Sequence, residues 1–273
     1  MLNPFKLFSE GISFLSHIYK NKYLMYELTR RDFKQKYAAN LMGLAWSVLD
    51  PLALMAIFWI IFGLGFRGGR NMEVPFIAYL ITGLMAYTFF QSALSQATAS
   101  IRSYSFLLKK VDFRVSILPL VKILSEYLLH GIVVIVMIVI LLLNRVYPSF
   151  YWFQFFYYSF ATGMLLLGLS WFSSAVNLFF PDINNIITIF LRFFFYLTPI
   201  FWQIEMFPEK FHWVLKLNPM YYIVAGYRDS FLFHRGFWCE PMLTLYFWGV
   251  TLISLAIGIA VFSKLKPHFA DVV

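Results

Sequence analysis

The sequence predicts an all-α integral membrane protein with six transmembrane helices, an N-terminal interfacial helix and two short re-entrant helices before the last span. Of its 273 residues, 61% are apolar and only 13% are charged, whereas a soluble domain carries roughly 25% charged residues. A water-soluble fold of this size cannot bury so much apolar surface. The apolar stretches lack the alternation of transmembrane strands, so helices are expected, because backbone groups in lipid must pair within the protein.

Residues 1–41 are expected to form a cytoplasmic arm that contains an amphipathic helix. Charged residues interrupt the arm, so it has no continuous apolar core and does not resemble a cleavable signal. Between positions 23 and 41, apolar side chains recur at helical spacing among basic residues, at Tyr26, Phe33, Tyr37 and Leu41. This pattern favours a helix that lies in the membrane interface. A polar arm with aromatic residues placed by chance is the alternative.

Six apolar stretches are long enough to cross a membrane, since a helix needs about 20 apolar residues to span a hydrocarbon core of roughly 30 Å. They cover residues 42–66, 74–101, 116–143, 150–180, 183–204 and 242–262. Together they define a transmembrane domain at 42–262, and a cytoplasmic tail follows at 263–273. An even number of spans places both ends on the same side of the membrane.

The distribution of charge predicts which side that is. The face with the arm, the second-to-third connection, the fourth-to-fifth turn and the tail carries 13 basic and 6 acidic residues, whereas the opposite face carries 7 and 5. Cytoplasmic loops are enriched in Lys and Arg. Both termini are therefore predicted to be cytoplasmic, with the protein in the plasma membrane. This asymmetry also accounts for the net charge of +9 without a nucleic-acid partner.

The external segment 205–240 is too apolar for a free loop and too short to cross the membrane twice. Asn218 and Pro219 divide its apolar run into two parts. We therefore expect two short re-entrant or interfacial helices. Such helices are tolerated at membrane depth only where they pack on protein or line a wet cavity.

Several motifs occur together and in order along the chain: RDFKQKY at 31–37, NLMGLAW at 40–46, DPL at 50–52, FPDI at 180–183, YLTPIFW at 196–202 and LNPMYY at 217–222. Over nearly its whole length the sequence resembles the permeases of ABC-type polysaccharide and polyol-phosphate exporters. Within that family it is most similar to the transmembrane subunits of wall teichoic acid exporters, through GFRGGR at 65–70, VPF at 74–76 and YYIVAGY at 221–227. Asn40 and Met42 replace the family's frequent serine and leucine, which are packing-sized changes.

The resemblance implies a homodimer of permeases that is embedded in membrane lipid and joined to two copies of a separate ATPase. This complex would move a lipid-linked anionic polymer, wall teichoic acid, out of the cell. The chain has no G-x-x-x-x-G-K-[ST] phosphate loop and no soluble domain large enough for a nucleotide. It is thus expected to hold no cofactor and to be no enzyme, with ATP and Mg²⁺ on the partner ATPase. The alternatives are an exporter of O-antigen or capsular polysaccharide and a membrane-embedded transferase.

The connection 102–114 is the candidate contact with the ATPase. A helix here could press an apolar face into a groove of the partner, and the resemblance implies a coupling helix at this place. The arm near Arg31 and Lys34 would frame the same contact. The candidate residues in the connection are Arg102, Tyr104, Phe106, Leu107, Lys109, Lys110, Asp112 and Arg114. A surface helix attracted to anionic lipid is the alternative.

Arg192 is the sharpest candidate for the substrate path. It lies 10 residues into the predicted fifth span, roughly 15 Å deep at 1.5 Å per residue, where a charge costs at least ~2.5 kcal/mol. It should therefore face the bundle interior or water, where it could attract phosphates of the polymer or of its lipid diphosphate. The alternative is a structural pair with Asp50 or Glu126.

Asp50 precedes Pro51 in the first span, and the proline removes one backbone hydrogen bond there. The resulting kink could shape a gate against the fifth span. Alternatively, Asp50 snorkels or pairs with Lys122. Aromatic rings could line the same route, because ring stacking tolerates different sugars, although most aromatic residues in such proteins face lipid. The candidates are Trp46, Tyr87, Phe89, Phe90, Trp152, Phe193, Tyr196 and Trp202.

The external segment is expected to act as an outer gate. Its candidate residues are His212, Trp213, Asn218, Pro219 and Tyr221. A metal site is not expected, because the five histidines are scattered without ligand spacing. Cys239 is the single cysteine, so the chain can form no internal disulfide.

Overall fold

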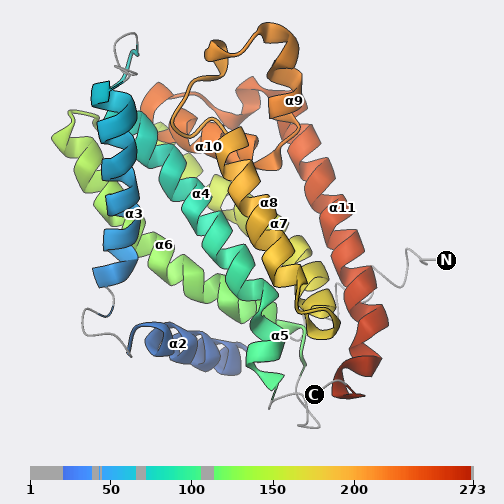
Figure 1. Cartoon of the computed structure of the whole chain (residues 1–273). Helices are drawn as coiled ribbons and strands as arrows, with labels where there is room; N and C mark the ends of the chain where they lie inside the picture. Colours follow the sequence, from blue (N-terminus) through green and yellow to red (C-terminus); the bar gives the residue numbers. More distant parts are fainter. Residues whose placement is uncertain (1–20, 39–42, 44, 66–71, 106–113, 272–273) are drawn as a thin grey trace.

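The computed structural model describes residues 21–38, 43, 45–65, 72–105 and 114–271. Within these residues, five long helices form the body of the protein, as Figure 1 shows. Each is long and apolar enough to cross a membrane. They are α3 (Ala45–Phe58, continued by a π-helix at Trp59–Gly65), α4 (Phe76–Thr98), α6 (Ile117–Leu143), α7 (Gln154–Phe179, preceded by a 3-10 turn at Phe150–Phe153) and α11 (Pro241–Leu265, followed by a 3-10 stretch at Lys266–Asp271). These helices correspond to the first, second, third, fourth and sixth predicted spans.

Helix α4 is the centre of the bundle. In its membrane-crossing stretch 78% of the residues are buried, against 11% for α3 and 22% for α11. It packs on α6, α7 and α10 (Pro219–Arg228), and α3 and α8 (Ile183–Leu197) flank it. Helix α3 therefore exposes most of its apolar surface, which includes Ile57, Ile60 and Leu64.

The predicted fifth span, 183–204, contains a shorter helix than expected. Helix α8 has 15 residues, about 22 Å at 1.5 Å per residue, which falls short of a hydrocarbon core of about 30 Å. It ends because Thr198 precedes Pro199 and takes an extended conformation, with φ −78° and ψ 134°, as residues before proline prefer. The count of six spans therefore stays a prediction.

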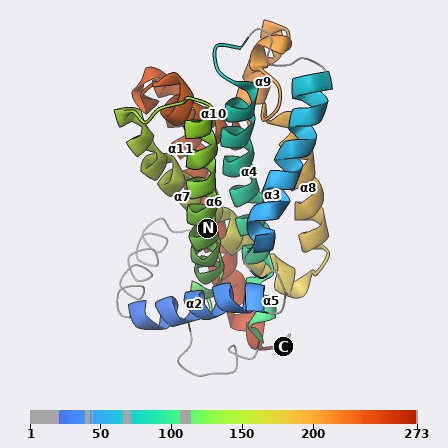
Figure 2. The ribbon, with the colours of Figure 1, turned by 90° about the vertical axis from the view of Figure 1, so that its left-hand side faces the viewer.

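Helix α2 (Lys22–Ala38) lies across one end of the bundle, beneath the long helices (Figure 2). Met25 of α2 is buried together with Ile117 and Val121 of α6. The short helix α5 (Ser100–Ser103) lies at the same end. A helix therefore occurs at the predicted segment 23–41, and its amphipathic character and its location in a membrane interface stay predictions.

The segment between α8 and α11 forms short helices at the opposite end from α2 (Figure 1). Helix α9 (His212–Lys216) is followed by α10, which a π-helix at Asp229–Phe233 extends. Asn218 caps α10: its side chain accepts a hydrogen bond from the helix backbone (3.0 Å) and donates one to Thr198 Oγ1 (2.7 Å). Two short helices thus occur where the sequence predicts them, and their re-entrant location stays a prediction.

Helices α7 and α11 approach each other closely at two glycines. A Cβ on Gly258 would lie 2.3 Å from the carbonyl oxygen of Gly168, and a Cβ on Gly168 would lie 2.6 Å from the Leu255 nitrogen. Small residues allow this kind of backbone approach between membrane helices. Gly168 and Gly258 therefore set the spacing of this helix pair.

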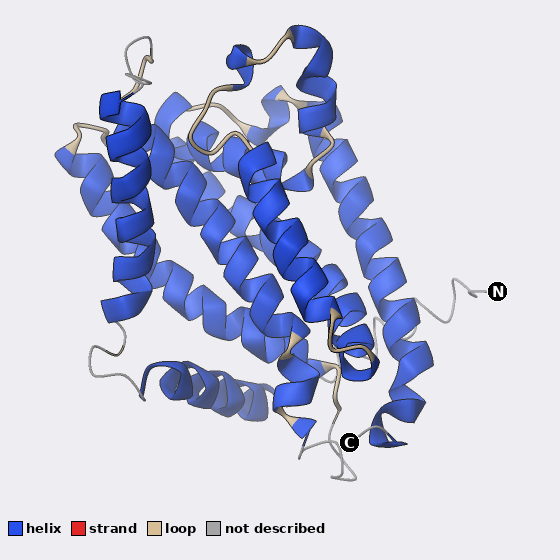
Figure 3. Cartoon of the chain, viewed as in Figure 1, coloured by secondary structure: helices blue, strands red, loops and turns tan. Residues whose placement is uncertain are grey.

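All regular secondary structure in the described part of the chain is helical (Figure 3). The all-α class is confirmed, and the five apolar helices agree with an integral membrane protein. Residues 106–113 lie outside the described residues. This stretch contains five of the candidate coupling residues, Phe106, Leu107, Lys109, Lys110 and Asp112.

Candidate functional site

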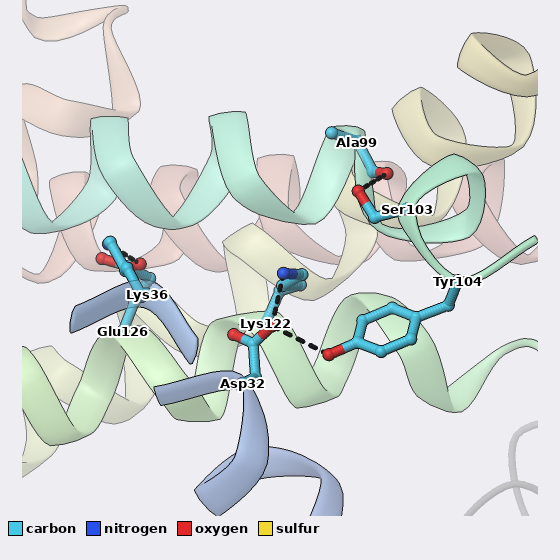
Figure 4. Close-up of polar contacts among 7 residues, drawn as sticks. All are labelled: Asp32, Lys36, Ala99, Ser103, Tyr104, Lys122 and Glu126. Carbon is cyan, nitrogen blue, oxygen red and sulfur yellow. Dashed lines mark hydrogen bonds and ion pairs between the residues drawn. The ribbon is translucent and has the colours of Figure 1, made fainter. Parts of the chain in front are cut away.

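Two ion pairs join α2 to α6 (Figure 4). Asp32 and Lys36 are one turn apart on α2, and Lys122 and Glu126 are one turn apart on α6. Lys122 pairs with Asp32, and Lys36 pairs with Glu126. Because both helices present their charges at i, i+4 spacing, the pairs form two successive rungs. We call these four residues the ion-pair ladder.

The carboxylates of the ladder accept further hydrogen bonds from two other elements. Tyr104, directly after α5, donates its hydroxyl to Asp32 Oδ1 (2.9 Å), and Ser92 of α4 donates to Glu126 Oε2 (2.7 Å). Asp32 and Glu126 are only 7% and 3% exposed, and buried charges of this kind need several partners. The ladder therefore connects α2, α4, α6 and the end of α5.

Tyr104 holds its proton firmly in this position. Burial, and then the charge and the hydrogen bond of Asp32, raise the pKa of the Tyr104 phenol. The ammonium group of Lys122 also lies 5.2 Å from the centroid of the Tyr104 ring, a cation–π contact. Tyr104 is thus a stable donor that fixes the Asp32 carboxylate beside Lys122.

A cavity of about 620 Å³ lies beside the ladder, between α3, α4 and α6. We call it the α4 cavity, because α4 contributes a stripe of polar side chains to it: Thr88, Gln91, Ser92, Ser95 and Gln96. Trp46 and Asp50 of α3 and His130 of α6 line it from the other sides. Lys36 and Glu126 also belong to its wall, so one rung of the ladder borders the cavity directly.

A second cavity of about 960 Å³, the α10 cavity, lies at the other end of the bundle, between α10 and the segment that follows α8. Its wall carries charges of both signs, on Glu73, Glu205, Lys216, Asp229, Arg235 and Glu240. Burial raises the pKa of Asp229 from 3.8 to about 6. The charge in this cavity therefore changes in the mildly acidic range.

Arg228 anchors the wall of the α10 cavity. It is 4% exposed and donates to the carbonyl oxygens of Pro199 (2.6 Å), Ile200 (2.7 Å) and Tyr79 (3.3 Å), and to the Tyr79 hydroxyl (2.9 Å). Its guanidinium also lies 3.5 Å from the centroid of the Tyr79 ring. Arg228 thus holds the turn after α8 against α4 and α10.

The model of the ABC-2 type transporter family matches residues 23–232, which include the ladder and the whole wall of the α4 cavity. The chain belongs to the ABC-2 type transporter family. It is 31% identical over 252 residues to the O-antigen export system permease protein RfbA of Klebsiella pneumoniae, which covers 91% of this chain and 94% of the relative. It is 23% identical over 263 residues to the RfbA of Myxococcus xanthus (95% and 99% covered), and 23% identical over 245 residues to the polysialic acid transport protein KpsM of Escherichia coli (85% and 89% covered).

In this ABC-2 transporter the described coupling candidates gather at the α2 end. Arg31 and Lys34 are exposed on α2, and Arg102 is exposed on α5. Tyr104 is buried in its hydrogen bond with the ladder, and Arg114 is partly buried just before α6. Their contact with an ATPase stays a prediction.

The candidates for the substrate path fall into separate groups. Trp46, Asp50 and Phe89 line the α4 cavity. Arg192, Phe193 and Tyr196 lie exposed on the outer face of α8. The fold therefore places one group in the wall of the α4 cavity and the other on the exposed face of α8.

Other aromatic candidates serve the packing of the bundle. Tyr87 is fully buried, and its hydroxyl donates to the Leu191 carbonyl (2.5 Å), which links α4 to α8. Trp202 donates its ring N–H to the Tyr196 carbonyl (3.2 Å) after the end of α8. Phe90 and Trp152 pack in the main core. These contacts favour a structural role for these side chains.

Two of the pairing partners that the sequence suggested, Glu126 for Arg192 and Lys122 for Asp50, form ion pairs with other residues. Lys122 and Glu126 both belong to the ladder. Arg192 and Asp50 form no hydrogen bond or ion pair with any residue that the structure describes. The alternative of a structural pair for either residue is therefore not supported within the described chain.

The outer-gate candidates surround the α10 cavity. His212 and Tyr221 line it, Asn218 and Pro219 form the break between α9 and α10, and Trp213 is 64% exposed. Within the described residues no cluster of His, Cys, Asp or Glu could hold a metal ion.

Sequence reasoning missed the ladder and the role of Arg228. Lys122 and Glu126 stand out as two charges one turn apart in an apolar span, which is a signal of a buried contact. Their partners on α2 could not be inferred, because the packing of α2 against α6 has no local pattern. Arg228 gave a weaker signal, a single cation within an apolar run of the external segment.

Proposed function

We propose that this chain is the permease subunit of an ATP-driven exporter for a lipid-linked polysaccharide of the O-antigen or capsular type. The observation that carries the proposal is the ABC-2 match over residues 23–232, combined with similarity to an O-antigen export permease along more than nine-tenths of both chains. Of the relatives described above, none is named as a teichoic acid exporter. Wall teichoic acid, which the resemblance suggested, is thus the less supported substrate.

The energy for export comes from a partner ATPase in this proposal. The sequence has no phosphate-binding loop of its own. Arg31, Lys34 and Arg102 are exposed at the α2 end, where they would contribute basic side chains to the docking surface. Two copies of the ATPase, each binding ATP and Mg²⁺, would dock on this end of a permease dimer.

The ion-pair ladder gives the ATPase a route to the membrane helices. A force that moves α2 acts on α6 through both rungs, and on α4 through the hydrogen bond from Ser92 to Glu126. Packed contacts with satisfied charges move as units and do not deform gradually. Closure of the ATPases on nucleotide would therefore shift α2, α6 and α4 together.

A second copy of the chain would complete the channel. Helix α3 and the outer face of α8 expose apolar surface, and that face of α8 carries Arg192. A charged side chain at membrane depth costs about 2.5–3.5 kcal/mol on insertion scales unless it faces water or protein. Arg192 would thus line a water-filled path between two copies, where it meets the diphosphate of the lipid carrier.

The orientation follows from charge. Lys and Arg predominate at the α2 end, so this end and both termini would be cytoplasmic by the positive-inside rule. The α10 cavity would then face outward and serve as the outer gate, held in shape by Arg228. Transport would run from the α2 end to the α10 end.

Deletion of the gene in its host tests the proposal. Cells that lack the chain should lose surface polysaccharide and accumulate the lipid-linked glycan inside, and the wild-type gene should restore export. Composition analysis of the missing polymer distinguishes a polysaccharide from glycerol or ribitol phosphate. Unchanged surface glycan in the deletion strain would refute the proposal.

A further inference from the structure

The polar stripe of α4 is unusual for a central membrane helix. Thr88, Gln91, Ser92, Ser95 and Gln96 recur at spacings of three and four residues, so they share one face. These side chains are partly exposed, whereas most of the remaining helix is buried. The stripe therefore faces the α4 cavity and not the packed core.

Three side chains of the stripe have donors and acceptors without a hydrogen-bond partner in the described part of the chain. The side chains of Gln91, Ser95 and Gln96 form no hydrogen bond with the residues that the structure describes. Each amide offers two donors and an acceptor, and each hydroxyl can do both. Polar groups at membrane depth are costly when they lack partners, so the cavity must supply water or a polar ligand.

The charges in the cavity wall argue against a phosphate ligand. Lys36 is the single Lys or Arg among the described residues of the wall, and it is paired with Glu126. Asp50 on the opposite side has no cation beside it within the described chain. The cavity is therefore negative overall and would repel an anion while accepting hydroxyl groups.

Aromatic rings complete the wall. Trp46 is 47% exposed and lines the cavity, as does Phe89. Amide, hydroxyl and carboxylate groups beside the exposed Trp46 ring suit a sugar, which has polar edges and apolar C–H faces. The volume of about 620 Å³ also lies within the usual range of small-ligand sites, roughly 300–1,000 Å³.

We propose that the α4 cavity binds an uncharged sugar unit of the transported glycan and excludes its phosphates. The inference rests on the proposed function and deepens it, because it names the part of the lipid-linked substrate that each protomer recognises. The described wall is formed by residues of α2, α3, α4 and α6. Arg192 on α8 would meet the diphosphate, and the α4 cavity would hold a neutral sugar.

Protection of an introduced cysteine tests this site in the complete permease–ATPase complex in nanodiscs. Ser95→Cys, in a Cys239→Ser background, places a thiol in the stripe with little change of size. Its labelling rate with a methanethiosulfonate reagent is measured with glycan released from host membranes by mild acid, and separately with inorganic diphosphate. Glycan at roughly ten times its Kd should slow labelling about tenfold, whereas diphosphate should leave the rate unchanged.

Three further measurements keep the result specific. Tyr147→Cys in the same Cys239→Ser background places a thiol at an exposed position that lines neither cavity, and it should label at the same rate with and without glycan. Thr88→Cys repeats the test at the other end of the stripe, in case Ser95→Cys does not fold. Asp50→Asn should increase labelling of the thiol in the stripe by an anionic reagent relative to a cationic one.

The outcomes separate this inference from the proposed function. Protection by diphosphate, or equal labelling with and without glycan at both thiols of the stripe, would overturn the sugar site even if deletion of the gene abolishes export. Protection by glycan in a chain whose deletion leaves surface polysaccharide intact would instead overturn the export function.

Discussion

The four charges of the ladder are held by complementary partners on every side. Asp32 accepts from Lys122 and Tyr104, and Glu126 accepts from Lys36 and Ser92. Removing one partner leaves an uncompensated buried charge, which costs more than removing the pair. The arm helix is therefore fixed to the bundle by single side chains whose loss is measurable.

Lys122→Met should destabilise the protein by about 3–5 kcal/mol, because it leaves Asp32 buried beside Tyr104 without a cation. The double variant Asp32→Asn, Lys122→Met removes both charges and should recover most of that loss. Denaturant titration in detergent measures the free energy of unfolding of the single and the double variant. Lys34→Met on the exposed side of α2 is the control and should change stability by no more than ~0.5 kcal/mol. A single variant as stable as the wild type would show that the rung does not hold α2.

The stability of the protein should depend on pH through Asp229, at the α10 end of the bundle. Burial raises its pKa in the folded protein from 3.8 to about 6, so the folded state binds this proton more tightly than the unfolded state. The contribution of this group to stability is therefore greatest at and below pH 4 and is lost as the pH rises through about 6. Melting temperatures of the wild type and Asp229→Asn should converge at low pH and diverge above about 6, with the wild type lower. Parallel curves for the two proteins would contradict this assignment.

The sequence indicated candidate functional residues where a charged side chain occurs within an apolar span. Arg192, Asp50 and Glu126 drew attention as charges in apolar spans. Which charge meets which depends on tertiary packing, and α2 supplies the partners that the sequence pattern could not indicate. The exposed Arg192 thus stayed unpaired within the described chain, while Glu126 found a lysine 90 residues away.

At the scale of elements, the contact between α7 and α11 depends on two glycines. Gly258→Ala should destabilise the protein by about 1–3 kcal/mol, because its methyl group would meet the backbone of Gly168 and the helices cannot separate without loss of packing. Gly249→Ala on the same helix meets no atom within 4 Å, so its stability should be unchanged or slightly raised. Thermal unfolding of both variants in the same detergent gives the comparison. Equal melting temperatures for the two variants would show that the close approach is not needed.

Helices were predictable from hydropathy and their ends from proline chemistry. Five of the six predicted stretches contain a helix of membrane-spanning length. The remaining stretch, the predicted fifth span, contains the shorter helix α8, which ends before Pro199. This proline was visible in the sequence, but the apolar residues that follow it suggested a longer helix. The burial of α10 against α4 and α7 could not be predicted, because a short apolar helix has the same sequence pattern whether it faces lipid or protein.

At the scale of the whole molecule, the central helix α4 contributes to two cavities of different character. The α4 cavity beside the ladder has amides, hydroxyls and aromatic rings, and the α10 cavity carries many charges. In the proposed function, force on α2 would reach the first cavity through the ladder, and Arg228 anchors the wall of the second. The proposed function would then have the ATPase act at the α2 end and the substrate leave at the α10 end.

Transport in proteoliposomes tests the central claim most directly. The purified chain, together with its partner ATPase, is reconstituted with lipid-linked polysaccharide isolated from the host. Movement of the glycan across the bilayer is followed by its accessibility to a glycosidase added to one side. The account predicts movement only when the ATPase and ATP–Mg²⁺ are both present, and none with the chain alone. Glycan movement or chemical conversion by the chain without its partner, or no movement with the complete system, would contradict it.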